Sequence, residues 1–213
     1  MAEHDSGGAG PNGQIAGILL AGGQSRRMGG GDKCLQVLGG RPILAHIVER
    51  AAPQVAQLVV NANGDPERFA QFGLPVAADT IGGYAGPLAG VLTGMEWAAA
   101  NARKCDWVAT FASDAPFFPV DFVKRLSAVI ADGSGDMAGT VSGGRRHPVF
   151  GLWPVALRAE LRAALTEREI RKVEDWTKGY NLKEVEFDVD TIDPFFSVNR
   201  PEDLVTAESL LTN

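Results

Sequence analysis

The sequence predicts an α/β fold, a single doubly wound, Rossmann-like domain around a mostly parallel sheet. Short apolar runs alternate with segments of helical periodicity, as in successive βαβ units. The chain has 213 residues, of which 45% are hydrophobic, enough for one sizeable core. No repeat or second change in composition marks a linker. We therefore expect a domain over residues 14–213, preceded by a polar, glycine-rich, disordered tail over residues 1–13.

The first half of the chain supplies most of the regular pattern. Residues 15–20 form a short apolar run that stops at Ala21-Gly22-Gly23, as a buried strand does before a tight loop. Pro42 fits the first turn of a helix over residues 42–52, where apolar side chains share one face. The same criteria predict strands at 58–61, 75–78 and 107–112 and a helix at 87–100.

The second half is less regular. A helix is expected over residues 120–130, and two strands at 137–141 and 148–153 flank the turn residues Gly143-Gly144. A helix at 155–165, a strand at 185–189 and a final helix at 201–210 complete the predicted elements.

Charge and cysteine content narrow the class of protein. The net charge of −6 and the pI near 5.1 argue against a nucleic-acid-binding surface but are compatible with a small anionic ligand. No apolar run approaches the roughly 20 residues that cross a bilayer, and no secretion signal is present. Cys34 and Cys105 are far apart and lack metal-ligand spacing, which predicts free thiols in a reducing cytoplasm.

The segment LAGGQSRRMGGGDK, residues 20–33, is the strongest candidate for binding a ligand. It follows the first strand, at the sheet edge where α/β proteins bind ligands. Its glycines allow backbone N–H groups to approach phosphate oxygens, and Arg26, Arg27 and Lys33 add cationic donors. This combination suits a triphosphate. The alternative is a flexible glycine-rich connection with solvated arginines.

Two common phosphate-binding motifs are absent from this segment. Lys33 follows Asp32 and precedes Cys34, which does not match a Walker A sequence, and there is no GxGxxG in register. A similar pattern at residues 133–138 follows a helix and precedes a strand, the reverse of the dinucleotide-binding context, and so predicts a turn.

Polar residues also follow three other predicted strands. Asp114 and Asp79 come after strands, and Asn61 ends one, so all three should share the edge of the glycine loop. A carboxylate in such a place suits Mg²⁺, which binds one or two carboxylates together with waters and substrate phosphates. The alternative interpretation of Asp114 is a helix cap or turn former. Gly86-Pro87 predicts a turn into a helix, and Gly90 inside that helix indicates close packing or ligand approach.

Other residues with chemical potential have a structural interpretation. His46 lies on a predicted helix, and the three histidines, His147 among them, lack the spacing of a zinc site. Trp176 and the other tryptophans are expected to be packing residues.

The glycine-rich segment resembles the signature of nucleotidyltransferases that act on cofactors and sugars. Together with GYAGPLAGVLTG, FASDAPF and RRHPVFGLW, it makes the chain similar to the molybdenum cofactor guanylyltransferase family in particular. The motifs occur in the family's order from about Ile15 to the C-terminal PEDL segment. The predicted fold is then a nucleotidyltransferase domain.

The resemblance implies transfer of GMP from GTP to the terminal phosphate of molybdopterin or the molybdenum cofactor, with release of pyrophosphate. It also implies Mg²⁺ as cofactor, a cytoplasmic setting, and molybdoenzymes or their chaperones as protein partners. Catalytic roles carry over to Arg27, Lys33 and Asp114, with Asp114 as the metal ligand. The GTP-binding residues implied are Leu20, Ala21, Gly22, Gly23, Lys33, Asn61, Asp79 and Asp114.

The acceptor side is less distinctive. The resemblance assigns it to Gly86, Arg145, Arg146, Pro148 and Asn199. Family members often carry Asn-x-Asn where this chain has Ser197-Val198-Asn199, which weakens the assignment.

Two alternatives remain open at this point. One is an enzyme of the same fold that uses CTP, either a cofactor cytidylyltransferase or a sugar-phosphate nucleotidyltransferase. Leu-Ala-Gly-Gly rather than Leu-Ala-Ala-Gly favours the guanylyl branch. The other is a noncatalytic module that binds a nucleotide and delivers cofactor, which the presence of both Lys33 and Asp114 argues against.

Overall fold

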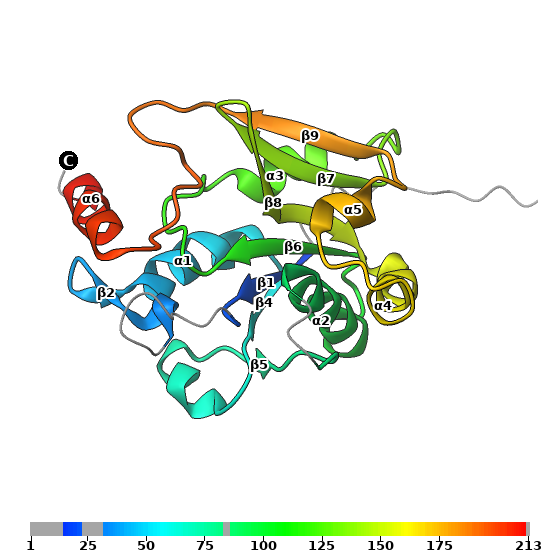
Figure 1. Cartoon of the computed structure of the whole chain (residues 1–213), viewed down its shortest axis with the longest axis horizontal. Helices are drawn as coiled ribbons and strands as arrows, with labels where there is room; N and C mark the ends of the chain where they lie inside the picture. Colours follow the sequence, from blue (N-terminus) through cyan, green and yellow to red (C-terminus); the bar gives the residue numbers. More distant parts are fainter. Residues whose placement is uncertain (1–14, 23–31, 83–85, 212–213) are drawn as a thin grey trace, which may run out of the picture.

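A seven-stranded sheet lies at the centre of the computed structural model, which describes residues 15–22, 32–82 and 86–211. In order across the sheet the strands are β5 (Val76–Ala77), β4 (Gln57–Asn61), β1 (Ile15–Leu20), β6 (Trp107–Ala112), β8 (Arg145–Pro154), β7 (Met137–Ser142) and β9 (Leu182–Phe187) (Figure 1). From β5 to β6 neighbouring strands are parallel. β8 is antiparallel to both its neighbours, and β7 pairs with β9 in parallel. A small separate hairpin consists of β2 (Val37–Leu38) and β3 (Arg41–Pro42).

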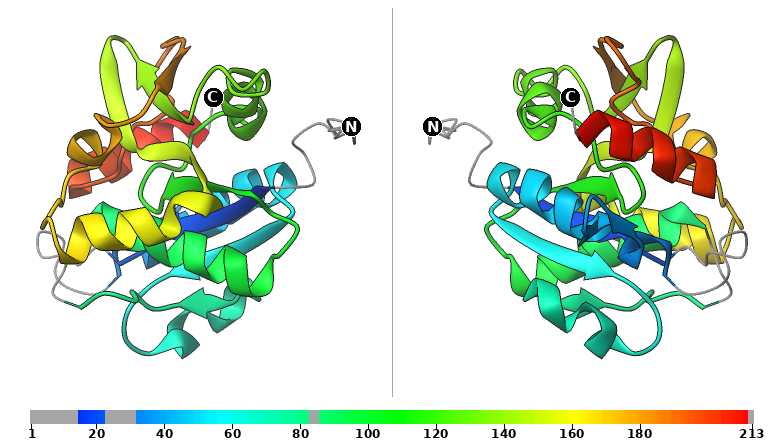
Figure 2. Two further views of the ribbon diagram at one scale, coloured as in Figure 1. Left: turned by 90° about the vertical axis from the view of Figure 1, so that its right-hand side faces the viewer. Right: turned by 90° about the vertical axis from the view of Figure 1, so that its left-hand side faces the viewer.

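Helices cover both faces of this sheet. The core on one face includes residues of α1 (Ile43–Ala51), α3 (Phe122–Ala128) and α6 (Pro201–Leu211). The core on the other face includes residues of α2 (Pro87–Asn101), α4 (Arg158–Thr166) and α5 (Val173–Thr177). The opposed views of Figure 2 show α4 in yellow on one side, and α1 in blue to cyan with α6 in red on the other. The predicted α/β class with a mostly parallel sheet is confirmed.

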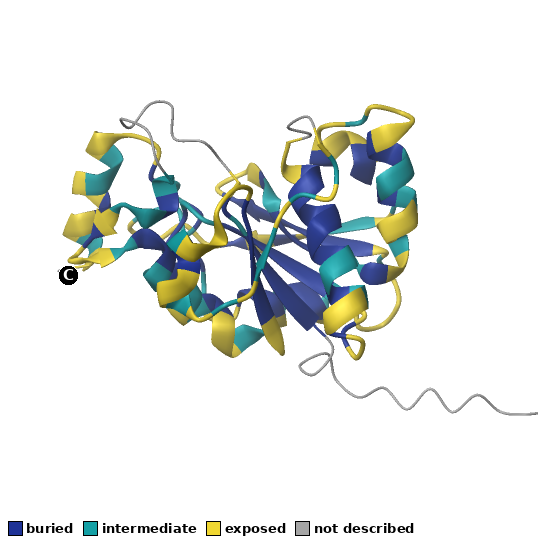
Figure 3. Cartoon of the chain, turned by 90° about the horizontal axis from the view of Figure 1, so that it is seen from below, coloured by how far each residue is buried: buried dark blue, intermediate teal, exposed yellow. Residues whose placement is uncertain are grey.

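β1 illustrates why its sequence is apolar throughout. Ile15 and Leu19 face the core that contains α1, whereas Ala16 and Ile18 face the core that contains α2. Figure 3 shows these central strands as buried between the helical layers. Full burial of one such branched side chain stabilises the fold by about 1.5–3 kcal/mol. A strand buried on both sides therefore carries no polar alternation.

The largest departure from the predicted elements is the β7–β8 hairpin. β8 begins at Arg145 rather than at residue 148, directly after the turn that contains Gly143 and Gly144. Both glycines have positive φ, +54° and +73°, which is the left-handed geometry that a tight two-residue hairpin requires. The long strand then runs antiparallel to β6, so the sheet is not uniformly parallel.

Other elements differ in smaller ways. β9 covers residues 182–187 instead of 185–189, because its parallel pairing with β7 starts at Leu182 opposite Met137 and ends at Phe187. The short α5 and the β2–β3 hairpin were not predicted from the periodicity. The tail predicted over residues 1–13 lies outside the described residues. In the described part of the chain, no helix combines the length and the apolar character required to cross a membrane.

Candidate active site

The carboxyl ends of the parallel strands meet in one row. Leu20 at the end of β1 pairs with Asn61 on one side and with Ala112 on the other. Gly22 and Asp114 lie two positions beyond the last residues of β1 and β6. The chain order of the strands reverses between β1 and β6, and such a switch point is where open α/β sheets bind ligands. The expectation that these strand ends share one edge is thus confirmed by the register.

A cavity of about 580 Å³ opens at this edge. Its volume lies within the range of small-molecule sites, roughly 300–1,000 Å³. Several residues singled out in the sequence line it together: Leu20, Gly22, Lys33, Asn61, Asp79, Gly86, Asp114 and Asn199.

Lys33 is at the centre of the polar groups on one side of the cavity. Its Nζ lies 2.6 Å from Asp114 Oδ2 and 2.5 Å from Asn199 Oδ1. The backbone supports this arrangement, because Val198 N donates to Asp114 O at 2.8 Å. Lys33 itself begins a 3₁₀ turn, and the preceding Asp32 pairs with Arg68. An ammonium group, a carboxylate and an amide oxygen thus converge from three distant parts of the chain.

Asp114 does not cap a described helix. α3, the next helix along the chain, begins at Phe122, and Asp121 occupies its N-cap position. The side chain of Asp114 is 25% exposed and turns instead to Lys33. The helix-cap alternative for Asp114 is therefore wrong, although Asp114 does lie in a turn after β6, and it lines the cavity.

The Cys34 thiol, next to Lys33 in the sequence, is unsuited to act as a nucleophile. Cys34 is buried, and that burial raises the pKa of its thiol to about 12, with Asp32 acting in the same direction. A thiol with such a pKa stays protonated near neutral pH, and the thiolate is the nucleophilic form. Both Cys34 and Cys105 are free, as predicted.

Asp79 is held on the opposite side of the cavity by two amides. Asn61 Nδ2 donates to Asp79 Oδ1 and Asn63 Nδ2 donates to Asp79 Oδ2, each at 2.8 Å. Asn63 Oδ1 in turn accepts from the backbone N of Asp79 at 2.8 Å. Asn61 is only 3% exposed and also donates to Ala77 O. These bonds orient the Asp79 carboxylate before any ligand arrives.

Two glycines of α2 allow the helix to approach β1 and β4 closely. A Cβ at Gly90 would lie 2.6 Å from both Asn61 Oδ1 and Leu20 Cδ2. One turn later, a Cβ at Gly94 would lie 2.8 Å from Ile18 Cγ2. Both distances are shorter than real Cβ contacts, so an alanine at either position would displace the side chain that faces it. Only Gly90 also lines the cavity.

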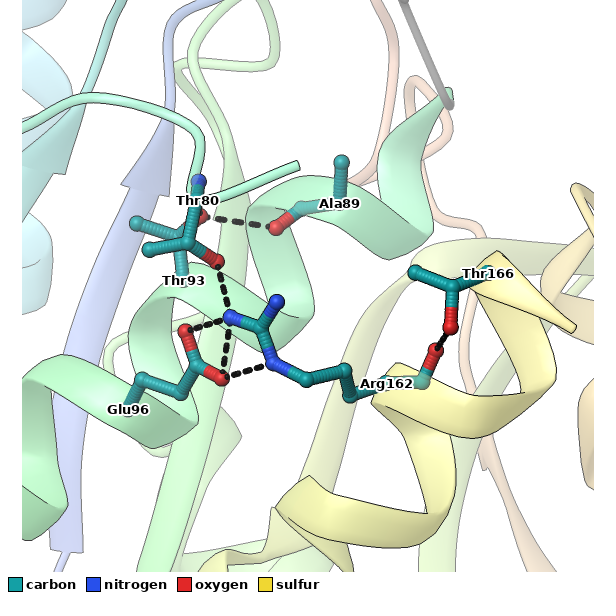
Figure 4. Close-up of polar contacts among 6 residues, drawn as sticks. All are labelled: Thr80, Ala89, Thr93, Glu96, Arg162 and Thr166. Carbon is teal, nitrogen blue, oxygen red and sulfur yellow. Dashed lines mark hydrogen bonds and ion pairs between the residues drawn. The ribbon is translucent and has the colours of Figure 1, made fainter. Parts of the chain in front are cut away.

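A second network supports the residue after Asp79 (Figure 4). Arg162 of α4 contacts both carboxylate oxygens of Glu96 on α2, with Nη2 at 2.7 and 2.8 Å. The same Nη2 donates to Thr80 Oγ1 at 3.1 Å. The backbone N of Thr80 donates to Thr93 Oγ1 at 3.4 Å. The chain leaving Asp79 is therefore fastened to two helices.

Some predicted residues lie away from the cavity. Arg146 pairs with Glu184 of β9, and together with Pro148 it lines a separate hollow of about 30 Å³. Strand alternation is the physical reason, because Val149 lines the main cavity and its neighbour Pro148 must face the other side of β8. Arg145 is exposed at the hairpin tip.

The remaining predicted residues lie next to the cavity or outside the described chain. Ala21 is buried, and its backbone N donates to Asn61 O at 2.9 Å. Gly23 and Arg27 lie outside the described residues. The prediction that His46 is structural holds, since its Nε2 lies 2.9 Å from Leu38 O. Trp176 packs against Trp153, as expected of a core residue.

Other lining residues were not found from the sequence. Val149, Ser113 and Ser197 contribute to the walls, and Asn63 orients Asp79. Ser113 and Asn63 could have been found, because each lies within two residues of a predicted site residue at a strand end. Val149 is an apolar residue in mid-strand and carried no such signal.

A doubly wound sheet whose switch point holds a cavity lined in part by charged and amide side chains defines the class of α/β proteins that bind nucleotides at this edge. Within that class, residues 17–181 match the model of the MobA-like NTP transferase domain, and the chain belongs to this family of nucleotidyltransferases.

Relatives over nearly the whole chain agree with this family. The chain is 52% identical over 200 residues to the molybdenum cofactor guanylyltransferase of Mesorhizobium japonicum, covering 92% of this chain and 96% of that protein. The fold of the present chain is similar to that of molybdopterin-guanine dinucleotide biosynthesis protein A from Archaeoglobus fulgidus, with a TM-score of 0.70 and 19% identity. The match covers 92% of this chain and 98% of that chain. A Mycobacterium tuberculosis protein in complex with manganese has a TM-score of 0.64, 15% identity and coverage of 92% and 98%. The resemblance seen in the motifs is confirmed.

Proposed function

We propose that this protein transfers GMP from GTP to the terminal phosphate of molybdopterin or the molybdenum cofactor and releases pyrophosphate. The observation that carries the proposal is the convergence of Lys33, Asp114 and Asn199 at the switch-point cavity. The name of the 52% identical relative from Mesorhizobium japonicum supports the choice of nucleotide and acceptor. The setting we infer is the cytoplasm, with molybdoenzymes or their chaperones as recipients of the product.

The residues of the cavity suit a direct displacement at phosphorus. In this proposal the acceptor phosphate attacks the α-phosphorus in line, so no protein nucleophile is needed. Lys33 neutralises charge on the triphosphate. Arg27 and Gly23 are also assigned to the triphosphate, from the sequence alone. Asn61, Asp79 and Gly22 hold the nucleoside side of GTP. Gly86 and Asn199, which line the cavity, are the residues we assign to the acceptor.

The donor set fits a magnesium ion. Asp114 Oδ2 and Asn199 Oδ1 both point at one cationic centre, the Lys33 ammonium, so the site already gathers oxygen ligands around positive charge. Mg²⁺ typically takes one or two carboxylates and completes its shell with waters and substrate phosphates. Asp114 would hold the ion, which would supply positive charge next to the departing pyrophosphate. The Lys33 ammonium would neutralise part of the remaining charge on the triphosphate.

Nucleotide preference and turnover can be tested on the full chain. With Mg²⁺ present, GTP should raise the melting temperature more than CTP or ATP, since a ligand at a hundredfold excess over its Kd stabilises by about 2.7 kcal/mol. Pyrophosphate release should require GTP and molybdopterin together. A larger shift with CTP would assign the protein to the cytidylyl branch. Binding of GTP with no pyrophosphate released in the presence of acceptor would favour the delivery module.

A further inference from the structure

A buried polar cluster lies outside the cavity, at the tip of the β7–β8 hairpin. Ser142, His147 and Asp193 form it, and Ser142 is fully buried while His147 is 8% exposed. Ser142 Oγ lies 2.6 Å from His147 Nε2 and 2.8 Å from Asp193 Oδ1. Serine, histidine and aspartate side by side invite comparison with a hydrolytic triad, so the direction of each hydrogen bond matters.

The donors and acceptors of the cluster can be assigned from its geometry. Asp193 Oδ1 accepts from the backbone N of Phe195 at 2.8 Å, and it also faces the Ser142 hydroxyl. The single hydroxyl hydrogen of Ser142 must therefore be donated to Asp193. His147 Nε2 then has to donate to Ser142 Oγ, which defines its tautomer.

This direction rules out a nucleophilic serine. A triad histidine accepts the serine proton, whereas here His147 donates to the hydroxyl. Burial, the largest cause, lowers the pKa of His147 below its usual 6.5, although Asp193 acts in the opposite direction. Ser142 is also inaccessible to a substrate. The cluster is therefore a structural connection between the hairpin and the segment that begins at Asp193.

That segment leads directly to the cavity. Phe195 is buried, with its ring 4.8 Å from those of His147 and Phe150. Three residues later, Val198 is fully buried and its backbone N donates to Asp114 O. Asn199 follows. Each anchor restricts the backbone that presents Asn199.

The far end of the segment is restrained as well. Asp203 Oδ2 accepts from the backbone N of Asn199 at 2.7 Å and from that of Arg200 at 2.8 Å, at the start of α6. The segment is therefore held by Asp193 at one end and by α6 at the other. Of these anchors, Asp193 alone ties it to the β7–β8 hairpin through a serine hydroxyl.

We propose that Asp193 is a positioning residue, which acts through Ser142 and the Phe195 backbone to set where Asn199 lies relative to Lys33 and Asp114. Its effect on turnover rests on the proposed function, because Asn199 is assigned there to the acceptor side. Its effect on the order of the segment does not. The two consequences can be measured separately.

The first measurement is hydrogen–deuterium exchange on the ligand-free full chain. Asp193→Ala and Ser142→Ala should speed exchange of the amides in residues 195–200, including Val198, by about tenfold or more. Asp193→Asn should restore slow exchange, because an amide oxygen accepts the same two hydrogen bonds. Ser127→Ala is the matched control, since Ser127 is also a buried serine but donates within α3, to Val123 O at 2.7 Å. Exchange in this segment should not change in that control.

The second measurement is pyrophosphate release, with GTP affinity determined separately by calorimetry. Asp193→Ala and Ser142→Ala should lower kcat/KM for molybdopterin by about tenfold or more, since small displacements of a positioned group cost large factors in rate. GTP affinity should stay within about twofold of wild type, and Asp193→Asn should recover most of the rate.

Outcomes against the proposal are distinct from those against the function. Unchanged exchange in Asp193→Ala and Ser142→Ala, or equal impairment in Asp193→Asn and Asp193→Ala, would overturn the positioning role. The role would also be overturned if Asp193→Ala and Ser142→Ala exchanged faster but had the same kcat/KM for molybdopterin as the Ser127→Ala control. A wild-type protein that releases no pyrophosphate would refute the proposed function, and the exchange data would still decide whether Asp193 orders the segment.

Discussion

Replacing Gly90 with alanine should impair both stability and nucleotide binding, whereas Gly94→Ala should impair stability alone. The added methyl group at position 90 would lie 2.6 Å from Asn61 Oδ1, and the one at position 94 would lie 2.8 Å from Ile18 Cγ2. Overpacking of this kind typically costs about 1–3 kcal/mol. Alanine returns about 1 kcal/mol through its better helix propensity. We therefore expect a net loss of about 0–2 kcal/mol in each variant, with a fall in melting temperature of about 2–4 °C per kcal/mol.

The difference between the two variants lies in what moves. At position 90 the displaced groups are the Leu20 side chain and the Asn61 side chain, and Asn61 donates to Asp79 at 2.8 Å. Loss of one such hydrogen bond costs about 0.5–1.5 kcal/mol, so GTP affinity should fall roughly two- to tenfold. At position 94 the displaced group is the apolar Ile18. Differential scanning fluorimetry and calorimetry with GTP and Mg²⁺ measure the two effects. Equal loss of GTP affinity in both variants, or unchanged affinity in Gly90→Ala, would refute the reasoning.

Four other changes have defined outcomes. Lys33→Ala should weaken GTP binding by about 1.5–3 kcal/mol in calorimetry, the worth of a charge-assisted contact; unchanged affinity would remove Lys33 from the triphosphate site. Asp114→Asn should lower the rate of pyrophosphate release far more than GTP affinity, and near-normal turnover at saturating Mg²⁺ would move the metal elsewhere. Burial lowers the pKa of His147, so on acidification the unfolded chain binds the proton at a higher pH than the folded chain does. The contribution of His147 to the free energy of unfolding should therefore be full above about pH 6.5 and decrease below it. In urea titrations, His147→Gln should lose less stability over this pH range than the wild type. Arg162→Ala should lower stability by only about 0.5–1 kcal/mol in the same titrations, because its pair with Glu96 is partly exposed; a loss above about 3 kcal/mol would mean a much stronger coupling of α4 to α2.

Strand ends were the most predictable part of the candidate site. A parallel strand buried on both faces appears as a continuous apolar run, so the polar residue that follows it is easy to locate. Asp114 after β6 and Asn61 at the end of β4 were found in this way. Their meeting at one edge then follows from parallel pairing, which the register of β1 with both neighbours bears out.

Features that depend on long-range pairing were not predictable. Val149 reaches the cavity only because β8 runs antiparallel to β6 with Gly151 opposite Thr110, and no local pattern encodes that register. The same register turns Pro148 to the opposite face of β8. Its presence in the RRHPVFGLW segment therefore did not indicate which face of the strand it occupies. The short α5 and the β2–β3 hairpin were missed because too few residues are involved to establish a period.

The separation of Lys33 and Asn199 along the sequence has a consequence for the order of folding. These two residues are 166 positions apart, and every strand of the central sheet other than β1 lies between them. Closing so long a loop carries a large entropic cost unless the elements between its ends are already paired. The sheet can therefore form before Lys33 and Asn199 come into contact. Under the proposed function, a chain at that stage of folding would offer Lys33 and Asp114 to a nucleotide without Asn199, so nucleotide binding can precede competence for transfer.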